Sequence, residues 1–292
     1  MSKLYKALAK AEQDRLRRQP NGIPGERSTQ QGHTVASASP DISHQSMSPP
    51  DGKALLGLEE HLVTLRTPGS FEAEQYRSLA YTIQQLHTNA GLDVVAVSSP
   101  AVGDGKTTTA INLAAVLAQI PGMRVLLVEA DVRQPAIGRY LGEHQAPLRG
   151  LGDLMLEPSL PLQEVIWTYT PRPLGILTAG CTSASPHELL ASPRLGMVFQ
   201  EARQLYDCVV VDTPPLIPLS DCRLIGKWVD GFLIVVAVHK TTRRLLEEAL
   251  TVVEPDKRVG LVINKDERII PGYYSSSVPS VNGQYKRRHS PG

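Results

Sequence analysis

Residues 98–109 combine glycines, a lysine and hydroxyl side chains in the pattern of a phosphate-binding loop. They read Ser-Ser-Pro-Ala-Val-Gly-Asp-Gly-Lys-Thr-Thr-Thr. The glycines allow a tight turn in which successive backbone N–H groups face phosphate oxygens. Lys106 is spaced to reach β- and γ-phosphates, and Thr107 to give its hydroxyl to Mg²⁺. The residues predicted to contact the phosphates are Val102, Gly103, Asp104, Gly105, Lys106, Thr107 and Thr108.

The flanking sequence supports this interpretation. An apolar, β-branched run at 94–97 precedes the loop, and apolar residues three and four apart follow it over 106–119. Strand, glycine-rich turn and helix form the structural context that such a loop requires. Pro100 stands where the first glycine of the motif is usual. The alternative is an ordinary glycine-rich connection between a strand and a helix.

Carboxylates follow two other apolar runs. Glu129 and Asp131 come after the run at 125–128, and Asp212 comes after the run at 209–211. A buried acid at a strand end is costly unless it meets a cation, and Mg²⁺ prefers oxygen ligands. We therefore predict a magnesium site formed by Thr107, Asp131 and Asp212. Glu129 and Asp131 are further candidates to touch the metal or to orient a nucleophile, although Asp131 could instead cap the following helix.

The elements that must position these residues alternate along the chain. Continuous apolar runs predict strands at 94–97, 124–128, 175–178, 208–211, 232–238 and 259–263. Helical spacing predicts helices over 106–119, 187–204, 220–227 and 241–253, with short helices between about 130 and 156. Apolar runs without alternation are typical of parallel strands buried on both sides. The predicted fold is α/β, a mostly parallel sheet covered by helices on both faces, as in phosphate-loop NTPases.

Composition limits the function classes. The 292 residues are 41% hydrophobic with a net charge of +1, so no global field favours nucleic acid. No apolar run approaches the roughly 18 residues of a membrane span, and no signal peptide is evident. Three cysteines without a paired spacing fit a reducing compartment. We expect a short amphipathic helix at 1–18, a disordered linker at 19–53, a folded domain at 55–268 and a flexible, tyrosine-containing tail at 269–292. The basic ends of the chain either meet an anionic surface or are merely solvated.

The motifs together resemble those of one family. The phosphate loop occurs with an apolar segment at 125–133 that ends Glu-Ala-Asp-Val-Arg, close to the form apolar-D-x-D-x-R, and with Asp-Thr-Pro-Pro at 212–215. This set is similar to that of the bacterial tyrosine autokinases (BY-kinases), which belong to the MinD/ParA-related branch of phosphate-loop NTPases. Residues 1–10 resemble the N-terminal segment of the subgroup that is associated with exosortase-linked polysaccharide loci. Glu74 and Arg77 match the E-x-x-R segment that mediates self-association in the family, so the resemblance implies a homo-oligomer.

The resemblance implies a reaction and a cellular role. Lys106, Glu129, Asp131 and Asp212 would be the catalytic residues, ATP and Mg²⁺ the cofactors, and the tail tyrosines the phosphate acceptors: Tyr273, Tyr274 and Tyr285. The kinase would regulate exopolysaccharide or capsule biosynthesis. It would be cytoplasmic and peripheral at the inner membrane, beside an inner-membrane polysaccharide chain-length (co-polymerase) activator. The chain departs from the family pattern at Glu129, where Asp is usual, at Ala80, where a second Arg is usual, and in its few tail tyrosines.

Two other functions stay open from the sequence. A MinD/ParA-like ATPase switch would hydrolyse ATP without phosphorylating protein. That group carries a signature lysine five residues before the loop lysine, and Ala101 occupies the position here. A nucleotide-binding scaffold with little catalysis is the other alternative, and the three departures from the family pattern keep it open.

Overall fold

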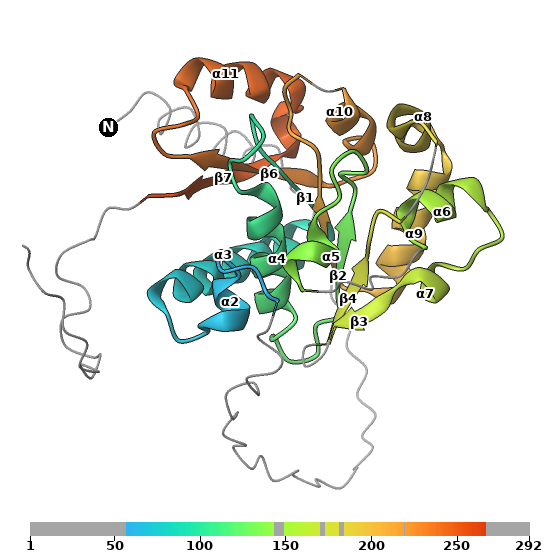
Figure 1. Ribbon diagram of the computed structural model, residues 1–292, viewed down its shortest axis with the longest axis horizontal. Helices are drawn as coiled ribbons and strands as arrows, with labels where there is room; N and C mark the ends of the chain where they lie inside the picture. The colour runs from blue at the N-terminus through green and yellow to red at the C-terminus, as the bar shows by residue number, and fades with distance from the viewer. Residues whose placement is uncertain (1–56, 143–148, 170–172, 181–183, 219, 267–292) are drawn as a thin grey trace, which may run out of the picture. The chain divides into compact units, whose positions relative to one another are not determined.

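A seven-stranded sheet forms the centre of the computed structural model, which describes residues 57–142, 149–169, 173–180, 184–218 and 220–266 (Figure 1). The predicted segments 1–18, 19–53 and 269–292 lie outside the described residues. In chain order the strands are β1 Val94–Ser98, β2 Val125–Glu129, β3 Trp167–Tyr169, β4 Leu174–Leu177, β5 Cys208–Asp212, β6 Gly231–Ala237 and β7 Arg258–Asn264. Their order across the sheet is β3-β4-β2-β5-β1-β6-β7, and every pair is parallel except β3–β4. The mostly parallel sheet is thus confirmed.

Helices cover both faces of the sheet, as the apolar strands require. One face carries α2 Val63–Arg66, α3 Phe71–Ala90, α4 Lys106–Leu117 and α5 Ile137–Tyr140. The other carries α6 Leu151–Leu156, α7 Leu162–Val165, α8 Pro186–Ala191, α9 Arg194–Leu205, α10 Asp221–Ile225 and α11 Arg243–Val252. A 3₁₀ turn, η1 Pro255–Lys257, leads into β7. Along β1, Val94 and Ala96 enter one core while Val95 and Val97 enter the other, so this strand contributes to both.

The predicted helix over 187–204 is wrong, because the segment forms two helices. Ser192 adopts an extended conformation with φ −64° and ψ 132°, between α8 and α9. The next residue is Pro193, and a residue before proline is disfavoured in helical conformation. The structure also contains elements that the apolar pattern did not indicate: the antiparallel edge strand β3 and the helices α2, α3 and α7.

The carboxyl ends of the three central strands meet at one edge of the sheet. In the register of the ladders, Asp212 lies opposite Val97 on one side and Glu129 on the other. Ligands of open parallel sheets bind outside the carboxyl ends of the strands. The chain therefore brings the loop after β1 and the acids after β2 and β5 to this edge. Among the described residues, no helix is both long and apolar enough to cross a membrane.

Candidate functional site

The phosphate loop connects β1 to α4, as its sequence predicts. Gly103 and Gly105 have φ of 78° and 101°, which L-residues with a side chain rarely adopt. Gly105 is also the residue before α4, and it offers no side-chain cap to the first turn. The first N–H groups of a helix have no intrahelical partners and carry a partial positive charge. The loop thus presents backbone donors suited to an anion.

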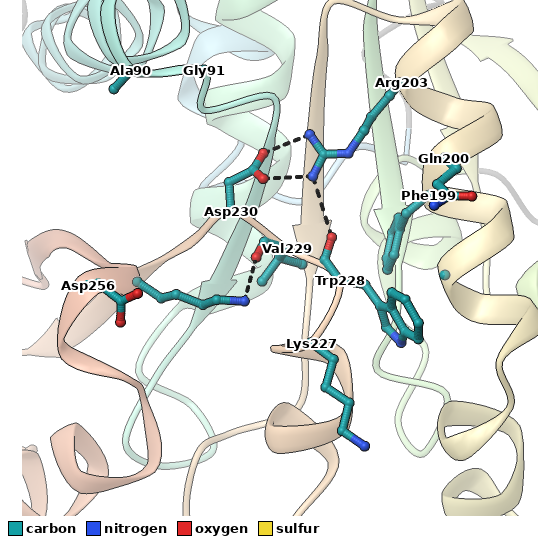
Figure 2. A pocket seen from close by; sticks show the side chains of 12 residues that line it. Ala90, Gly91, Phe199, Gln200, Arg203, Lys227, Trp228, Val229, Asp230 and Asp256 are labelled. Atoms are coloured by element: carbon teal, nitrogen blue, oxygen red, sulfur yellow. Dashed lines mark hydrogen bonds and ion pairs between the residues drawn. The ribbon is translucent and has the colours of Figure 1, made fainter.

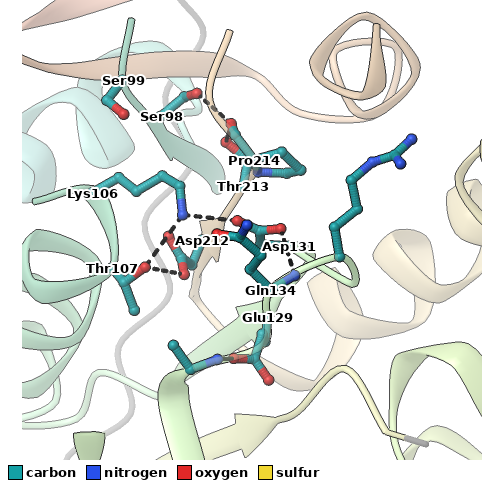
Figure 3. Close-up of polar contacts among 12 residues, drawn as sticks. Ser98, Ser99, Lys106, Thr107, Glu129, Asp131, Gln134, Asp212, Thr213 and Pro214 are labelled. Carbon is teal, nitrogen blue, oxygen red and sulfur yellow. Dashed lines mark hydrogen bonds and ion pairs between the residues drawn. The ribbon is translucent and has the colours of Figure 1, made fainter. Parts of the chain in front are cut away.

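Lys106 and Asp131 form the central ion pair of this site. The Lys106 ammonium lies 2.8 Å from Asp131 Oδ2, with both side chains largely buried (Figure 3). Burial alone lowers the pKa of Lys106, but the negative charges of Asp212 and Asp131 outweigh it and raise that pKa above its usual value. Asp131 Oδ1 also accepts the N–H of Gln134 at 3.2 Å. Asp131 therefore caps a turn and holds the loop lysine at once.

Thr107 and Asp212 form a second contact beside the first. The Thr107 hydroxyl donates to Asp212 Oδ2 at 2.8 Å (Figure 3). Complete burial raises the pKa of Asp212 to about 7, against the opposing effects of the Lys106 charge and the Thr107 hydrogen bond. Among the described residues, nothing hydrogen-bonds its other oxygen, Oδ1. A buried carboxylate oxygen without a partner, next to a threonine hydroxyl, suits a hard cation such as Mg²⁺.

Glu129 has a different place from the one expected. Its Oε1 accepts the N–H groups of Ala136 and Ile137 at 2.5 and 2.7 Å, and its Oε2 accepts that of Ala179 at 3.0 Å. Both carboxylate oxygens are thus directed to backbone amides, and the side chain is 2% exposed. In this arrangement Glu129 holds the loop after β2 to the end of β4. Among the described residues it makes no hydrogen bond or ion pair with Lys106 or Asp131. The contacts of Glu129 are therefore structural ones, and its expected catalytic role stays a prediction.

Arg133, from the same loop, pairs with an acid that the sequence did not single out. Its guanidinium lies 2.6 and 3.2 Å from the two oxygens of Asp221, at the start of α10. Asp221 is completely buried, whereas the Arg133 side chain is 36% exposed. The hydrogen bond to Asp221 raises the pKa of Arg133 above its usual value. The pair fixes the segment that carries Asp131.

A separate hollow of about 470 Å³ lies at the opposite edge, near the amino ends of β1 and β6. There Arg203 pairs with both oxygens of Asp230 at 2.9 and 2.7 Å (Figure 2). Asp230 also accepts the N–H groups of Asp93 and Val94, and Lys257 donates to the carbonyl of Val229. Arg203 and Asp230 are thus paired with each other and Lys257 is bound to the backbone, so this hollow is part of the structural frame rather than of the phosphate site.

The remaining predicted residues lie apart from the phosphate site or outside the described residues. Glu74 and Arg77 form an ion pair at 2.5 Å on α3, and Arg77 also donates to the carbonyl of Pro68. Position 80 is an alanine buried in the helical layer that packs on the sheet. The predicted acceptors Tyr273, Tyr274 and Tyr285 lie outside the described residues.

Three contacting residues of the phosphate loop were missed by the sequence analysis. Lys240, Asn264 and Lys265 donate to carbonyl groups of the loop from the ends of β6 and β7. The signal that could have found them is the one used for Asp131 and Asp212, namely polar residues in the short segment after an apolar run.

The chain is similar to a described protein family and to several known proteins. A family model described as an AAA domain matches residues 92–254. The tyrosine-protein kinase YwqD of Bacillus subtilis is 31% identical over 211 residues, which cover 71% of this chain and 86% of the relative. The succinoglycan biosynthesis transport protein ExoP of Rhizobium meliloti is 33% identical over 234 residues. That match covers 78% of this chain and 28% of ExoP, so the chain spans less than a third of this longer relative.

Solved structures agree with these matches. The chimerical protein CapA2B2 superposes with a TM-score of 0.65 at 26% identity, covering 76% of this chain and all of that chain. The tyrosine kinase domain of BceF superposes with a TM-score of 0.62 at 27% identity, covering 69% of this chain and 81% of that one.

Proposed function

Because this chain belongs to the bacterial tyrosine-protein kinases, with a phosphate-loop AAA-type domain, we propose that it is an autokinase that transfers the γ-phosphate of MgATP to its own C-terminal tyrosines. One observation carries the proposal. Lys106, Thr107, Asp131 and Asp212 come from three separate segments and meet within hydrogen-bond distance at one edge of the sheet. This combination of a cation, a hydroxyl and two acids is what phosphoryl transfer requires.

The oxygens of Thr107 and Asp212 are the best candidates to hold Mg²⁺. Asp212 Oδ1 is buried without a hydrogen-bond partner among the described residues, which is the condition that a bound cation would relieve. Bound there, the metal would neutralise developing negative charge on the phosphates. Lys106 would bind the β- and γ-phosphates, and the N–H groups of residues 103–108 would surround them.

The transfer itself forms one bond and breaks one. The phenol oxygen of a tyrosine attacks the γ-phosphorus, and the bond from that phosphorus to the β–γ bridging oxygen breaks to leave ADP. The phenol proton needs an acceptor near the attacking oxygen, and Asp131 is the second-strand acid that faces Lys106. We assign Asp131 this role, and we assign Glu129 to holding the loop that carries it.

The wider role rests on the relatives. Names such as succinoglycan biosynthesis transport protein, for ExoP, connect related chains to polysaccharide export. We infer a role in regulating exopolysaccharide or capsule biosynthesis at the cytoplasmic side of the inner membrane, next to a membrane-bound chain-length partner. The acceptors would be Tyr273, Tyr274 and Tyr285, presented to a neighbouring copy of the chain. Glu74 and Arg77 on α3 would contribute to the contact between copies. Membership of the exosortase-associated subgroup stays a prediction.

The test is incubation of the full chain with MgATP, followed by mass spectrometry of the C-terminal peptide. We expect phosphate on at least one of Tyr273, Tyr274 and Tyr285, and none in Lys106→Met. The matched control is Lys227→Met, which removes an exposed lysine at the opposite edge of the sheet and should leave phosphorylation intact.

The other outcomes separate the alternatives. Release of ADP without phosphotyrosine would refute the kinase and favour an ATPase switch, provided that the cytoplasmic part of the membrane partner is present. Bound ATP without turnover would favour a scaffold. If the variant with phenylalanine at all three tyrosines is still phosphorylated, the acceptors have been assigned wrongly.

A further inference from the structure

Three side chains from the ends of β6 and β7 hold the outer side of the phosphate loop. The Lys240 ammonium donates to the carbonyl of Val102 at 2.6 Å, and the Lys265 ammonium donates to that of Gly103 at 2.9 Å. Asn264 Nδ2 donates to the carbonyl of Asp104 at 2.9 Å. Three consecutive peptide carbonyls are thus bound by three donors that lie 138 to 162 residues away in the sequence. We call Lys240, Asn264 and Lys265 the loop clasp.

Holding these carbonyls also sets the direction of the next N–H groups. A trans peptide is planar, and its C=O and N–H point to opposite sides. The clasp therefore turns the N–H groups of residues 103, 104 and 105 away from β6 and β7. The positive φ values on either side of Asp104, 78° at Gly103 and 101° at Gly105, fit a concave nest of N–H groups that binds anions. Within the described residues, none of these three N–H groups has a hydrogen-bond partner.

Lys240 has a second task inside the loop. Asp104 is completely buried, and its Oδ2 accepts the N–H of Ala101 at 3.0 Å. Its Oδ1 has no hydrogen-bond partner among the described residues, and the Lys240 ammonium lies 3.6 Å from it. A buried charge without a counter-ion is strongly unfavourable. Lys240 thus provides the positive charge next to the buried carboxylate of Asp104, which lies within the loop.

Backbone strain occurs at the same place. His239 and Lys265 have φ of 62° and 60°, and they are the only residues other than glycine with positive φ in the part of the chain that the structure describes. One precedes Lys240 and the other is itself a clasp residue. Left-handed conformation is unfavourable for residues with a Cβ, and such strain gathers where surrounding contacts enforce it for function.

We propose that the loop clasp is a positioning group for the polyphosphate of the nucleotide. It orders the three N–H groups of the loop toward the phosphates before the nucleotide arrives, and its two ammonium groups add positive charge on the outer side of the loop. The proposal rests on the proposed function, because it takes a nucleoside di- or triphosphate as the ligand. Its residues act through the loop and are not catalytic.

The test uses Lys265→Gly, Lys240→Met and the control Lys227→Met in the full chain. Affinity for MgADP and for a non-hydrolysable MgATP analogue is measured by titration, and stability without nucleotide by urea unfolding. Lys265→Gly should weaken both affinities about tenfold, the effect of losing one charge-assisted hydrogen bond. Its stability should be unchanged or higher, because glycine adopts the left-handed conformation freely. Lys240→Met should weaken affinity further, and arginine at either position should largely restore it.

Two results would overturn the clasp. In the first, Lys265→Gly and Lys240→Met bind nucleotide as tightly as the wild type and the control Lys227→Met. In the second, the amide resonances of Gly103, Asp104 and Gly105 are the same in nucleotide-free Lys265→Gly as in the nucleotide-free wild type. This readout needs no ligand. A wild-type chain that binds neither nucleotide would instead refute the proposed function, and the amide resonances would still decide on the clasp.

Discussion

Replacing Glu129 with glutamine tests whether this acid holds the structure or performs chemistry. The side chain is 2% exposed and accepts three backbone N–H groups, from Ala136, Ile137 and Ala179. Glutamine keeps the shape of the side chain but replaces one acceptor oxygen with an N–H donor. The amide oxygen can keep the bonds to Ala136 and Ile137. The amide nitrogen would then face the N–H of Ala179, and two donors cannot bond each other.

The magnitude follows from these three contacts. Hydrogen bonds to a charged acceptor contribute about 1.5–3 kcal/mol and neutral ones about 0.5–1.5, so each of the two kept bonds weakens by about 1 kcal/mol. The Ala179 N–H loses its partner in a buried position, which costs about 1–3 kcal/mol. Removing a buried charge recovers part of this loss, because the glutamine needs less solvation. We expect a net decrease in the free energy of unfolding of about 2–3 kcal/mol.

Urea unfolding measures the change, and hydrogen exchange locates it. The amides of Ala136, Ile137 and Ala179 should exchange faster in Glu129→Gln than in the wild type. The matched control is Glu157→Gln. The wild-type carboxylate of Glu157 is 48% exposed and pairs with Arg149, so the free energy of unfolding of this variant should stay within about 0.5 kcal/mol of the wild type. The reasoning fails if Glu129→Gln is as stable as the wild type, with unchanged exchange, yet has lost phosphorylation. That result would restore Glu129 as a catalytic acid.

Three further predictions concern Asp212, the frame opposite the site and the loop glycines. Burial raises the pKa of Asp212 to about 7 from 3.8, so its contribution to stability is present below about pH 4 and is lost as the pH rises through about 7. The metal-free protein should lose about 2–4 kcal/mol over that range in urea unfolding, and Asp212→Asn should remove this dependence. Arg203→Met breaks the bidentate pair with Asp230 and should lower stability by about 1–2 kcal/mol, while calorimetric nucleotide affinity stays unchanged at the distant edge. Gly105→Ala places a Cβ 2.0 Å from Asn264 Nδ2 at a φ of 101°, and it should lower nucleotide affinity at least tenfold without unfolding the chain. The first expectation fails if Asp212→Asn keeps the pH dependence of stability of the wild type. The second fails if Arg203→Met weakens nucleotide binding, and the third fails if Gly105→Ala binds nucleotide as tightly as the wild type.

All strands except β3 were predictable because each of them is an apolar run between polar loops. The run at 208–211 became Cys208–Asp212, and the run at 259–263 became Arg258–Asn264. The order of the strands was not predictable, since pairing depends on long connections whose path no local pattern records. The short strand Trp167–Tyr169 escaped because three residues are too few to show a period. The single helix expected over 187–204 ignored the restriction that Pro193 imposes on the residue before it.

The sequence was enough to predict which residues form the site, but less so which partners they contact. Residues after parallel strands meet at one edge, so Lys106, Asp131 and Asp212 were expected together, and the structure brings them together. Which acid faces which partner depends on side-chain length and on the path of the following loop. Glu129 is one methylene longer than the usual aspartate, and its carboxylate reaches backbone amides on two segments. No spacing rule contains that information.

The three acids at the carboxyl ends of the strands, Glu129, Asp131 and Asp212, differ in whether their oxygens have partners. Glu129 is saturated by backbone amides, and Asp131 is paired with Lys106, whereas Asp212 keeps an oxygen without a partner among the described residues. A cation is therefore expected at Asp212, and the triphosphate must compete with Asp131 for Lys106. Drawing Lys106 toward phosphate would release the Asp131 carboxylate, so that the proton acceptor becomes available only when nucleotide is bound. The carboxyl ¹³C resonance of Asp131 should then shift on addition of MgADP in the wild type, with no matching shift in Lys106→Met. Equal shifts in both proteins would mean that Lys106 does not couple the two events.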